Sequence, residues 1–151
     1  MRELIAKTMT IKHINVQQAH QEQARGATYL DVRSVPEFEA GHPEGAYNIP
    51  LLHMDPATGM MRPNPEFLSV VRATFPPETQ LVVGCKMGGR SAQACEILSS
   101  AGYRDVANVL GGFGGAPQYG HAGWVQAGLP TASTPAADHG YESLHKKAGG
   151  R

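Results

Sequence analysis

The chain has 151 residues, enough for one domain with its own hydrophobic core. Its 13 acidic and 13 basic residues give a formal net charge of zero, so no long-range field would gather nucleic acid or an anionic membrane. Two cysteines, Cys85 and Cys95, are too few for a disulfide framework, and neither they nor the seven scattered histidines have the spacing of a metal site.

The N-terminal stretch MRELIAKTMTIKHI lacks the apolar run that a secretion signal needs. No other segment approaches the length of a membrane span. A cytoplasmic location is therefore expected, and a reducing compartment would keep a reactive thiol free.

The first half of the chain alternates short helices with short strands. Asn15 and Gln18 form a capping box that opens a helix, and Gly26 ends this helix. The next expected elements are a buried strand at 29–32 and a helix at 34–41, which a second capping box of Ser34 and Glu37 opens. A weaker strand at 46–49 and an irregular loop at 51–63 follow.

The second half contains the strand with the clearest pattern. Asn64 is expected to cap a helix whose first residue is Pro65. Leu81, Val82 and Val83 form an apolar run without alternation, which is typical of a central parallel strand covered on both faces. The remaining expected elements are a helix at 94–101, a strand at 106–110 and a short helical turn from Trp124.

This order of elements predicts the fold class and the domain boundaries. Alternating strands and helices imply right-handed crossovers, so we expect an α/β fold with a doubly wound, mainly parallel central sheet and helices on both faces. Residues 1–130 are expected to form this domain. Residues 131–151 are small, polar and charged, and are expected to form a C-terminal tail that is mobile or loosely docked.

Cys85 has the setting of a nucleophile. It lies beyond the carboxyl end of the clearest strand and before a helix, where sites form in open α/β sheets. In the segment CKMGGRS, Gly88 and Gly89 permit unusual backbone angles, loop amides and the helix dipole favour an anion, and Lys86 and Arg90 add positive charge. These features favour the thiolate, the nucleophilic form of cysteine. The alternative is that Cys85 is a buried small hydrophobe.

Cys95 is expected to be structural. It falls inside the following helix, beside the apolar face, and its neighbours in sequence offer no donors. A resolving thiol is the alternative, and that role would require Cys95 to approach Cys85 in space.

Several segments, in the same order along the chain, resemble the rhodanese-like sulfurtransferases. TYLDVRSVPEFEAGHPEGAYNIP resembles the N-terminal rhodanese segment, and CKMGGRS matches the active loop C-x-x-G-x-R-S. LGGF and GWVQAGLP resemble the closing segment of the domain. GMMRPNPEFL is similar to a stretch of single-domain thiosulfate sulfurtransferases from plants and bacteria. The resemblance covers roughly residues 14–130.

The resemblance implies a ping-pong reaction without a metal ion or organic cofactor. Cys85 would attack the outer sulfur of thiosulfate or a similar small donor, sulfite would leave, and Cys85 would hold the sulfur as a persulfide. Cyanide in assays, or a cellular thiol with thioredoxin and glutathione as candidates, would then remove that sulfur.

The resemblance also implies roles for the residues around Cys85. The loop amides of Lys86, Met87, Gly88, Gly89, Arg90 and Ser91 would surround the persulfide. Arg90 would brace the loop and bias it toward anions, and Lys86 would favour a dianionic donor. Asp31 and Arg33 match the family's L-D-V-R stretch and either support the site or form an ion pair at the strand end.

One segment departs from the family pattern. GGAPQYGHA is inserted between Gly112 and Trp124, where simple single-domain members have a short turn. The insertion either forms part of the mouth of the site, with Tyr119 and His121 as candidates, or is a passive surface loop.

Other functions remain as alternatives. A cysteine phosphatase or arsenate reductase is disfavoured, because its loop has five residues between cysteine and arginine and this chain has four. A non-catalytic binding module is disfavoured by the retained Cys85. A dedicated persulfide carrier for a protein partner fits the sequence almost as well as a thiosulfate sulfurtransferase.

Overall fold

The computed structural model describes residues 11–150. Residues 1–10, which make up most of the stretch searched for a secretion signal, and Arg151 lie outside the described residues. Within residues 11–150, no helix is both long and apolar enough to cross a membrane.

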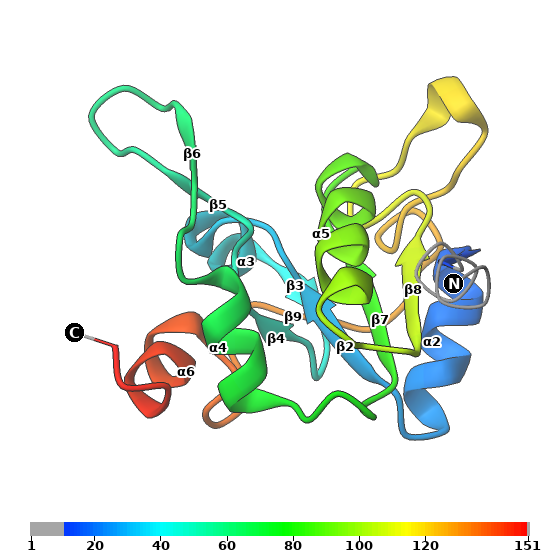
Figure 1. The fold of residues 1–151 in the computed structure, drawn as a ribbon. Coiled ribbons are helices and arrows are strands. Elements are labelled where there is room, and N and C mark those ends of the chain that lie inside the picture. The colour runs from blue at the N-terminus through cyan, green and yellow to red at the C-terminus, as the bar shows by residue number, and fades with distance from the viewer. Residues whose placement is uncertain (1–10, 151) are drawn as a thin grey trace.

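A five-stranded parallel sheet forms the centre of the molecule (Figure 1). The strand order is β1-β8-β7-β2-β4, so β7 is the central strand, with two strands on each side of it. Every residue of β7 is buried, as its uninterrupted apolar run predicts. The strands are β1 (Lys12–Ile14), β2 (Thr28–Asp31), β4 (Tyr47–Asn48), β7 (Leu81–Gly84) and β8 (Val106–Val109).

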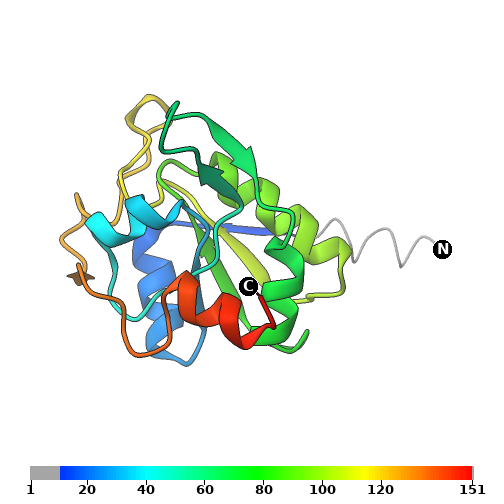
Figure 2. The ribbon, with the colours of Figure 1, turned by 90° about the vertical axis from the view of Figure 1, so that its left-hand side faces the viewer.

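Helices cover both faces of this sheet, seen from two directions in Figures 1 and 2. Leu30 and Val83 belong to one buried cluster, with α4 (Phe67–Thr74) and α5 (Gly89–Ser100). Val82 belongs to the second cluster, with α2 (Val16–Ala24), α3 (Val35–Ala40) and Trp124. Since neighbouring residues of a strand point to opposite faces, the two clusters lie on opposite sides of the sheet. The predicted doubly wound α/β fold is confirmed.

Both predicted capping boxes are present, but α4 begins later than predicted. Asn15 caps α2 together with Gln18, and Ser34 caps α3 together with Glu37. The prediction that the next helix starts at Pro65 was wrong, because α4 starts at Phe67. Asn64 Oδ1 accepts the amide hydrogen of Glu66 at 3.0 Å, so Asn64 closes a turn before the helix.

Two strand pairs outside the main sheet were not predicted. Residues 51–63, expected to be an irregular loop, contain the antiparallel strands β5 (Leu52–Met54) and β6 (Met61–Pro63). This hairpin is only half-buried or exposed, so its sequence lacks a strong apolar alternation. The second pair joins β3 (His42–Pro43) to β9 (Thr131–Ala132).

The C-terminal segment lies against the domain. Besides β9 it contains α6 (Tyr141–Lys147), which packs on α4. Leu144 is only 4% exposed and belongs to the cluster beneath α4 and α5. Asn64 Nδ2 lies 3.2 Å from the hydroxyl oxygen of Tyr141, to which it donates a hydrogen bond. Buried Leu144 and half-buried Tyr141 thus place this segment, which was expected to be mobile or loosely docked, against α4 despite its polar composition.

Candidate active site

Cys85 lies where β7 ends and the active loop, residues 85–91, begins. Its side chain is 2% exposed, and its sulfur accepts a hydrogen bond from the Gly88 amide at 3.1 Å. Gly88 has a φ of +121°, which favours glycine, so this residue turns its amide toward the sulfur. Gly89 has no positive φ, because it is already the first residue of α5. Of the two glycines expected to permit unusual backbone angles, Gly88 adopts one and Gly89 does not.

Ser91 links the sulfur to two further elements. Its hydroxyl oxygen lies 3.4 Å from Cys85 Sγ, 3.1 Å from the carbonyl oxygen of Gly88 and 2.5 Å from Oδ1 of Asn108. Asn108 lies in β8 and is 3% exposed, and its Nδ2 is 3.2 Å from Nδ1 of His13 in β1. Sequence reasoning missed Asn108 and His13. The available signal was a lone polar residue within the apolar run V-A-N-V, because a buried amide needs hydrogen-bond partners.

Arg90 fastens the active loop to α3. Its two terminal nitrogens donate to the two carboxylate oxygens of Glu37, at 2.7 and 3.0 Å. Burial alone would raise the pKa of Glu37, but hydrogen bonds from Arg90 and Ser34 and the charge of Arg90 outweigh it and lower this pKa to about 2. Arg90 therefore braces the loop, while Glu37 offsets part of its positive charge. Glu37 was noted in the sequence only as a capping residue.

Lys86 and Met87 form the outer side of the active loop. Lys86 is exposed, and 48% of Met87 is accessible to solvent. The Lys86 side chain passes beside Gly114, where an added Cβ would lie 3.2 Å from its Cγ. These two residues lie where an incoming donor or acceptor would meet the loop.

The segment after β8 holds the backbone of the active loop. Phe113 donates its amide hydrogen to the carbonyl oxygen of Cys85 at 2.7 Å, and Gly114 donates to that of Lys86 at 2.9 Å. At Gly112, with φ +53°, an added Cβ would collide with the Cys85 carbonyl oxygen. The start of the inserted segment is thus fitted closely to the active loop.

Asp31 and Arg33 support this arrangement from one layer away. They form a buried ion pair at 2.8 Å, and Arg33 also donates to the carbonyl oxygen of Gly41 at 2.7 Å. The guanidinium carbon lies 4.3 Å from the centre of the Phe113 ring. The pair therefore closes the strand end and is connected to the active loop through Phe113, whose amide donates to the Cys85 carbonyl oxygen.

The tip of the insertion extends away from the loop. Ala116 and His121 form an antiparallel bridge, and between them lies the short helix η1 (Pro117–Tyr119). Tyr119 is 73% exposed. Figure 1 shows this segment projecting into solvent beyond the upper edge of the sheet.

Cys95 lies fully buried in α5, and both cysteines are free. Burial, together with the nearby charges of Cys85 and Glu96, raises the pKa of Cys95 to about 12. A thiol with this pKa stays protonated near neutral pH, which supports the structural interpretation of Cys95.

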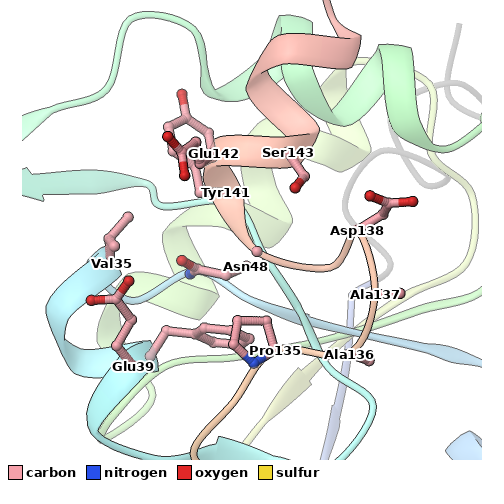
Figure 3. A pocket seen from close by; sticks show the side chains of 12 residues that line it. Val35, Glu39, Asn48, Pro135, Ala136, Ala137, Asp138, Tyr141, Glu142 and Ser143 are labelled. Atoms are coloured by element: carbon pink, nitrogen blue, oxygen red, sulfur yellow. The ribbon is translucent and has the colours of Figure 1, made fainter.

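A pocket of about 290 Å³ lies between α3 and the C-terminal segment (Figure 3). None of residues 85–91 lines it. Its lining includes the carboxylates of Glu39, Asp138 and Glu142, which would repel an anionic sulfur donor. The pocket is therefore not the donor site that the active loop requires.

Comparison with known proteins agrees with this geometry. The sequence profile of the family described as Rhodanese-like domain matches residues 15–115, about two thirds of the chain. The chain belongs to the rhodanese-like domain family. The matched range includes β2, the active loop and α5, so the family resemblance seen in the sequence is confirmed.

Individual rhodanese-like relatives cover most of the chain. Thiosulfate sulfurtransferase 16, chloroplastic, of Arabidopsis thaliana is 38% identical over 118 residues, which span 78% of this chain and 90% of the relative. Protein HIGH ARSENIC CONTENT 1, mitochondrial, of the same plant is 36% identical over 136 residues, spanning 89% and 75%. The crystal structure of Rv0390 from M. tuberculosis aligns with a TM-score of 0.69 at 27% identity, covering 82% of this chain and 98% of that one.

Proposed function

We propose that the protein is a sulfurtransferase that carries sulfane sulfur as a persulfide on Cys85. The observation that carries this proposal is the setting of the Cys85 sulfur, which accepts the Gly88 amide hydrogen and adjoins the Ser91 hydroxyl at the start of α5. The relative named thiosulfate sulfurtransferase 16, which is 38% identical, supports the same chemistry.

The reaction has two balanced halves. The Cys85 thiolate attacks the outer sulfur of thiosulfate, a sulfur–sulfur bond forms to Sγ, and the original bond breaks with its electron pair leaving on sulfite. An acceptor thiolate or cyanide then attacks the outer sulfur of the persulfide, and the Cys85 thiolate is released. In both halves the sulfur atom moves from one nucleophile to another without net oxidation or reduction of the reactants taken together. No external oxidant or reductant is therefore needed.

The loop residues contribute position and electrostatics. The Gly88 amide donates toward the sulfur that carries negative charge, which is the preorganised stabilisation that oxyanion-type sites use. The Arg90–Glu37 ion pair fixes the loop, and exposed Lys86 supplies positive charge for a dianionic donor.

Intact mass after mixing with thiosulfate tests the proposal. The unchanged protein should gain one sulfur atom, Cys85→Ser should gain none, and Cys95→Ser should gain one. A persulfide on Cys95, or none on either cysteine with thiosulfate and mercaptopyruvate as donors, would contradict it.

The exposed side chains favour a protein as the sulfur acceptor. Met60 on the β5–β6 hairpin, Met87 on the active loop and Tyr119 on the insertion are 62, 48 and 73% exposed. In Figures 1 and 2 the hairpin and the insertion both extend beyond the edge of the sheet that carries the active loop. A protein acceptor that approached the active loop from this edge of the sheet would meet these exposed side chains.

A comparison of two sulfur acceptors distinguishes a persulfide carrier that serves a protein partner from an enzyme that serves small thiols. Persulfide-loaded protein is mixed with reduced thioredoxin or with glutathione, and loss of the extra sulfur is followed by mass. A protein acceptor predicts that Met87→Ser slows transfer to thioredoxin about tenfold more than it slows transfer to glutathione, because a large partner buries more of this side chain. Equal slowing of both transfers would argue against a protein-docking role for Met87.

Phosphoryl and arsenate chemistry fit the loop less well. Four residues separate Cys85 from Arg90, and both terminal nitrogens of Arg90 are engaged by Glu37 rather than directed at an oxyanion. Because the name of one relative refers to arsenic, arsenate and an aryl phosphate belong among the substrates tested. We expect no turnover of either.

A further inference from the structure

A line of hydrogen bonds joins the Cys85 sulfur to a histidine at the edge of the sheet. It runs from Cys85 Sγ to Ser91 Oγ at 3.4 Å, from there to Asn108 Oδ1 at 2.5 Å, and from Asn108 Nδ2 to His13 Nδ1 at 3.2 Å. β1 and β8 are paired in a register that sets His13 directly beside Asn108. This series of hydrogen bonds therefore joins residues of three separate elements, α5, β8 and β1.

The hydrogens along this line of contacts can be arranged in two directions. In the first, the Cys85 thiol donates to Ser91, Ser91 donates to the Asn108 carbonyl oxygen, and the Asn108 amide nitrogen donates to an unprotonated His13 Nδ1. A serine hydroxyl has only one hydrogen, so while Ser91 donates to Asn108, or to the Gly88 carbonyl oxygen 3.1 Å away, it cannot donate to the sulfur. This direction suits a protonated thiol.

A thiolate requires the opposite direction. Ser91 must then donate to the sulfur, which is favoured when the Asn108 amide turns so that Nδ2 faces Ser91 and Oδ1 faces His13. In that arrangement His13 Nδ1 must carry a hydrogen. A protonated imidazole carries hydrogens on both nitrogens and always meets this requirement.

We propose that Asn108 and His13 are positioning residues that act on Cys85 through Ser91, so that a hydrogen on His13 Nδ1 favours the Cys85 thiolate. The proposal rests on the proposed function in one respect, since it takes this thiolate to be the attacking group. It gives the enzyme a fixed internal link between a surface imidazole and its buried nucleophile.

Burial makes this link specific. Ser91 is fully buried and Asn108 is 3% exposed, whereas His13 is exposed to solvent. Around these buried side chains there is little water to replace a missing hydrogen-bond partner. The orientation of the Asn108 amide therefore affects both Ser91 and His13.

Other charged and titratable groups act on the two ends only through space. Lys12 pairs with Asp105 at 3.1 Å beside His13. The charged and titratable groups near Cys85 include Lys86, the Arg90–Glu37 pair, Tyr29, Asp31 and Cys95. Their effects do not pass through Asn108 and should survive its replacement.

A double-mutant cycle tests the proposal. The ionisation of Cys85 is followed by thiolate absorbance against pH in a Cys95→Ser background, with His13 and with His13→Phe. We expect His13→Phe to raise the ionisation midpoint by about half a pH unit, a threefold effect. In an Asn108→Leu background the same substitution should have no effect, because the link is cut.

Control variants distinguish coupling through these hydrogen bonds from a direct electrostatic effect of a charge on Cys85. Lys12→Gln removes a positive charge from the same strand without touching Asn108, and should leave the midpoint unchanged. Ser91→Ala cuts the chain at a second point, so it serves as the test if Asn108→Leu does not fold by circular dichroism. An effect of His13→Phe that persists in either cut background, or no effect in any background, would overturn the proposal.

The outcome is independent of sulfur transfer. Coupling between His13 and Cys85 is read from ionisation, whereas persulfide formation is read from mass. If the coupling is found and thiosulfate loads no sulfur, the proposed function fails alone. If sulfur loads and no coupling is found, the role of Asn108 and His13 fails alone.

Discussion

The carboxylate of Glu37 receives both terminal nitrogens of Arg90, across 53 positions of sequence. The same carboxylate accepts the amide and hydroxyl hydrogens of Ser34, at 3.1 and 2.8 Å. One side chain therefore caps α3 and holds the active loop against it. Because the pair is only partly exposed, its geometry is better defined than that of an ordinary surface ion pair.

Glu37→Gln should loosen the active loop. The neutral amide cannot accept both guanidinium nitrogens, so Arg90 loses its fixed place, and misplacement of the loop by about 1 Å slows such reactions up to about 100-fold. We expect persulfide formation from thiosulfate to slow about 10- to 100-fold in stopped-flow measurements. Glu39→Gln, an exposed position on the same helix, is the matched control. Equal rates in Glu37→Gln and the unchanged protein would show that the ion pair does not position the loop.

Stability should fall in acid because of the same residue. The pKa of Glu37 is lowered to about 2 in the folded protein, below the ordinary value of about 4.3 in an unfolded chain. A group with a depressed folded pKa stabilises the protein fully above the unfolded value, and this contribution is lost as pH falls toward the folded value. Between pH 5 and about pH 2, the free energy of unfolding should therefore fall less steeply in Glu37→Gln than in the unchanged protein. Urea unfolding at several pH values measures both slopes, and parallel slopes would contradict the assignment.

Two glycines allow a matched test of the segment that holds the active loop. Gly112 and Gly120 both have positive φ, +53° and +74°, but only at Gly112 would an added Cβ meet the carbonyl oxygens of Cys85 and Lys86. Gly120→Ala should cost about 1–2 kcal/mol from backbone strain and leave sulfur transfer unchanged. Gly112→Ala should cost more than about 3 kcal/mol and slow transfer, because the collision falls on the backbone of Cys85. Thermal unfolding and persulfide mass report the two effects, and similar results for both variants would refute the close fit.

The two cysteines should differ sharply toward alkylating agents. The pKa of Cys95 is raised to about 12, chiefly by burial, so its thiolate is scarce at pH 8. Iodoacetamide should modify Cys85 in the folded protein and reach Cys95 only in denaturant. Peptide mass mapping assigns the modified positions. Labelling of Cys95 at a comparable rate under native conditions would show that the thiol is accessible and ionised.

Local sequence predicted the parts of the site that are themselves local. Cys85, Gly88 and the start of a helix lie within a few residues, so strand pattern and loop composition sufficed to place them together. The capping boxes at Asn15 and Ser34 were predicted for the same reason.

Contacts between distant elements were not predictable. The hydrogen bonds from Ser91 to Asn108 and on to His13 depend on the strand order β1-β8-β7, which alternation of elements leaves undetermined. Glu37 had a sufficient local explanation as a capping residue, which concealed its bond to Arg90. In each case the missing information was which elements become neighbours.

The C-terminal segment shows that sparse apolar residues can fix a polar stretch. Tyr141, Leu144 and Ala148 recur at helical spacing and face the cluster beneath α4. Leu144→Ala should lower the free energy of unfolding by about 2–3 kcal/mol, the low end of the range for a buried leucine, because α6 lies at the edge of the core. Lys146→Ala on the exposed side of the same helix should change it by less than about 0.5 kcal/mol. Urea unfolding compares the two variants, and equal small effects would mean that α6 contributes nothing to the folded domain.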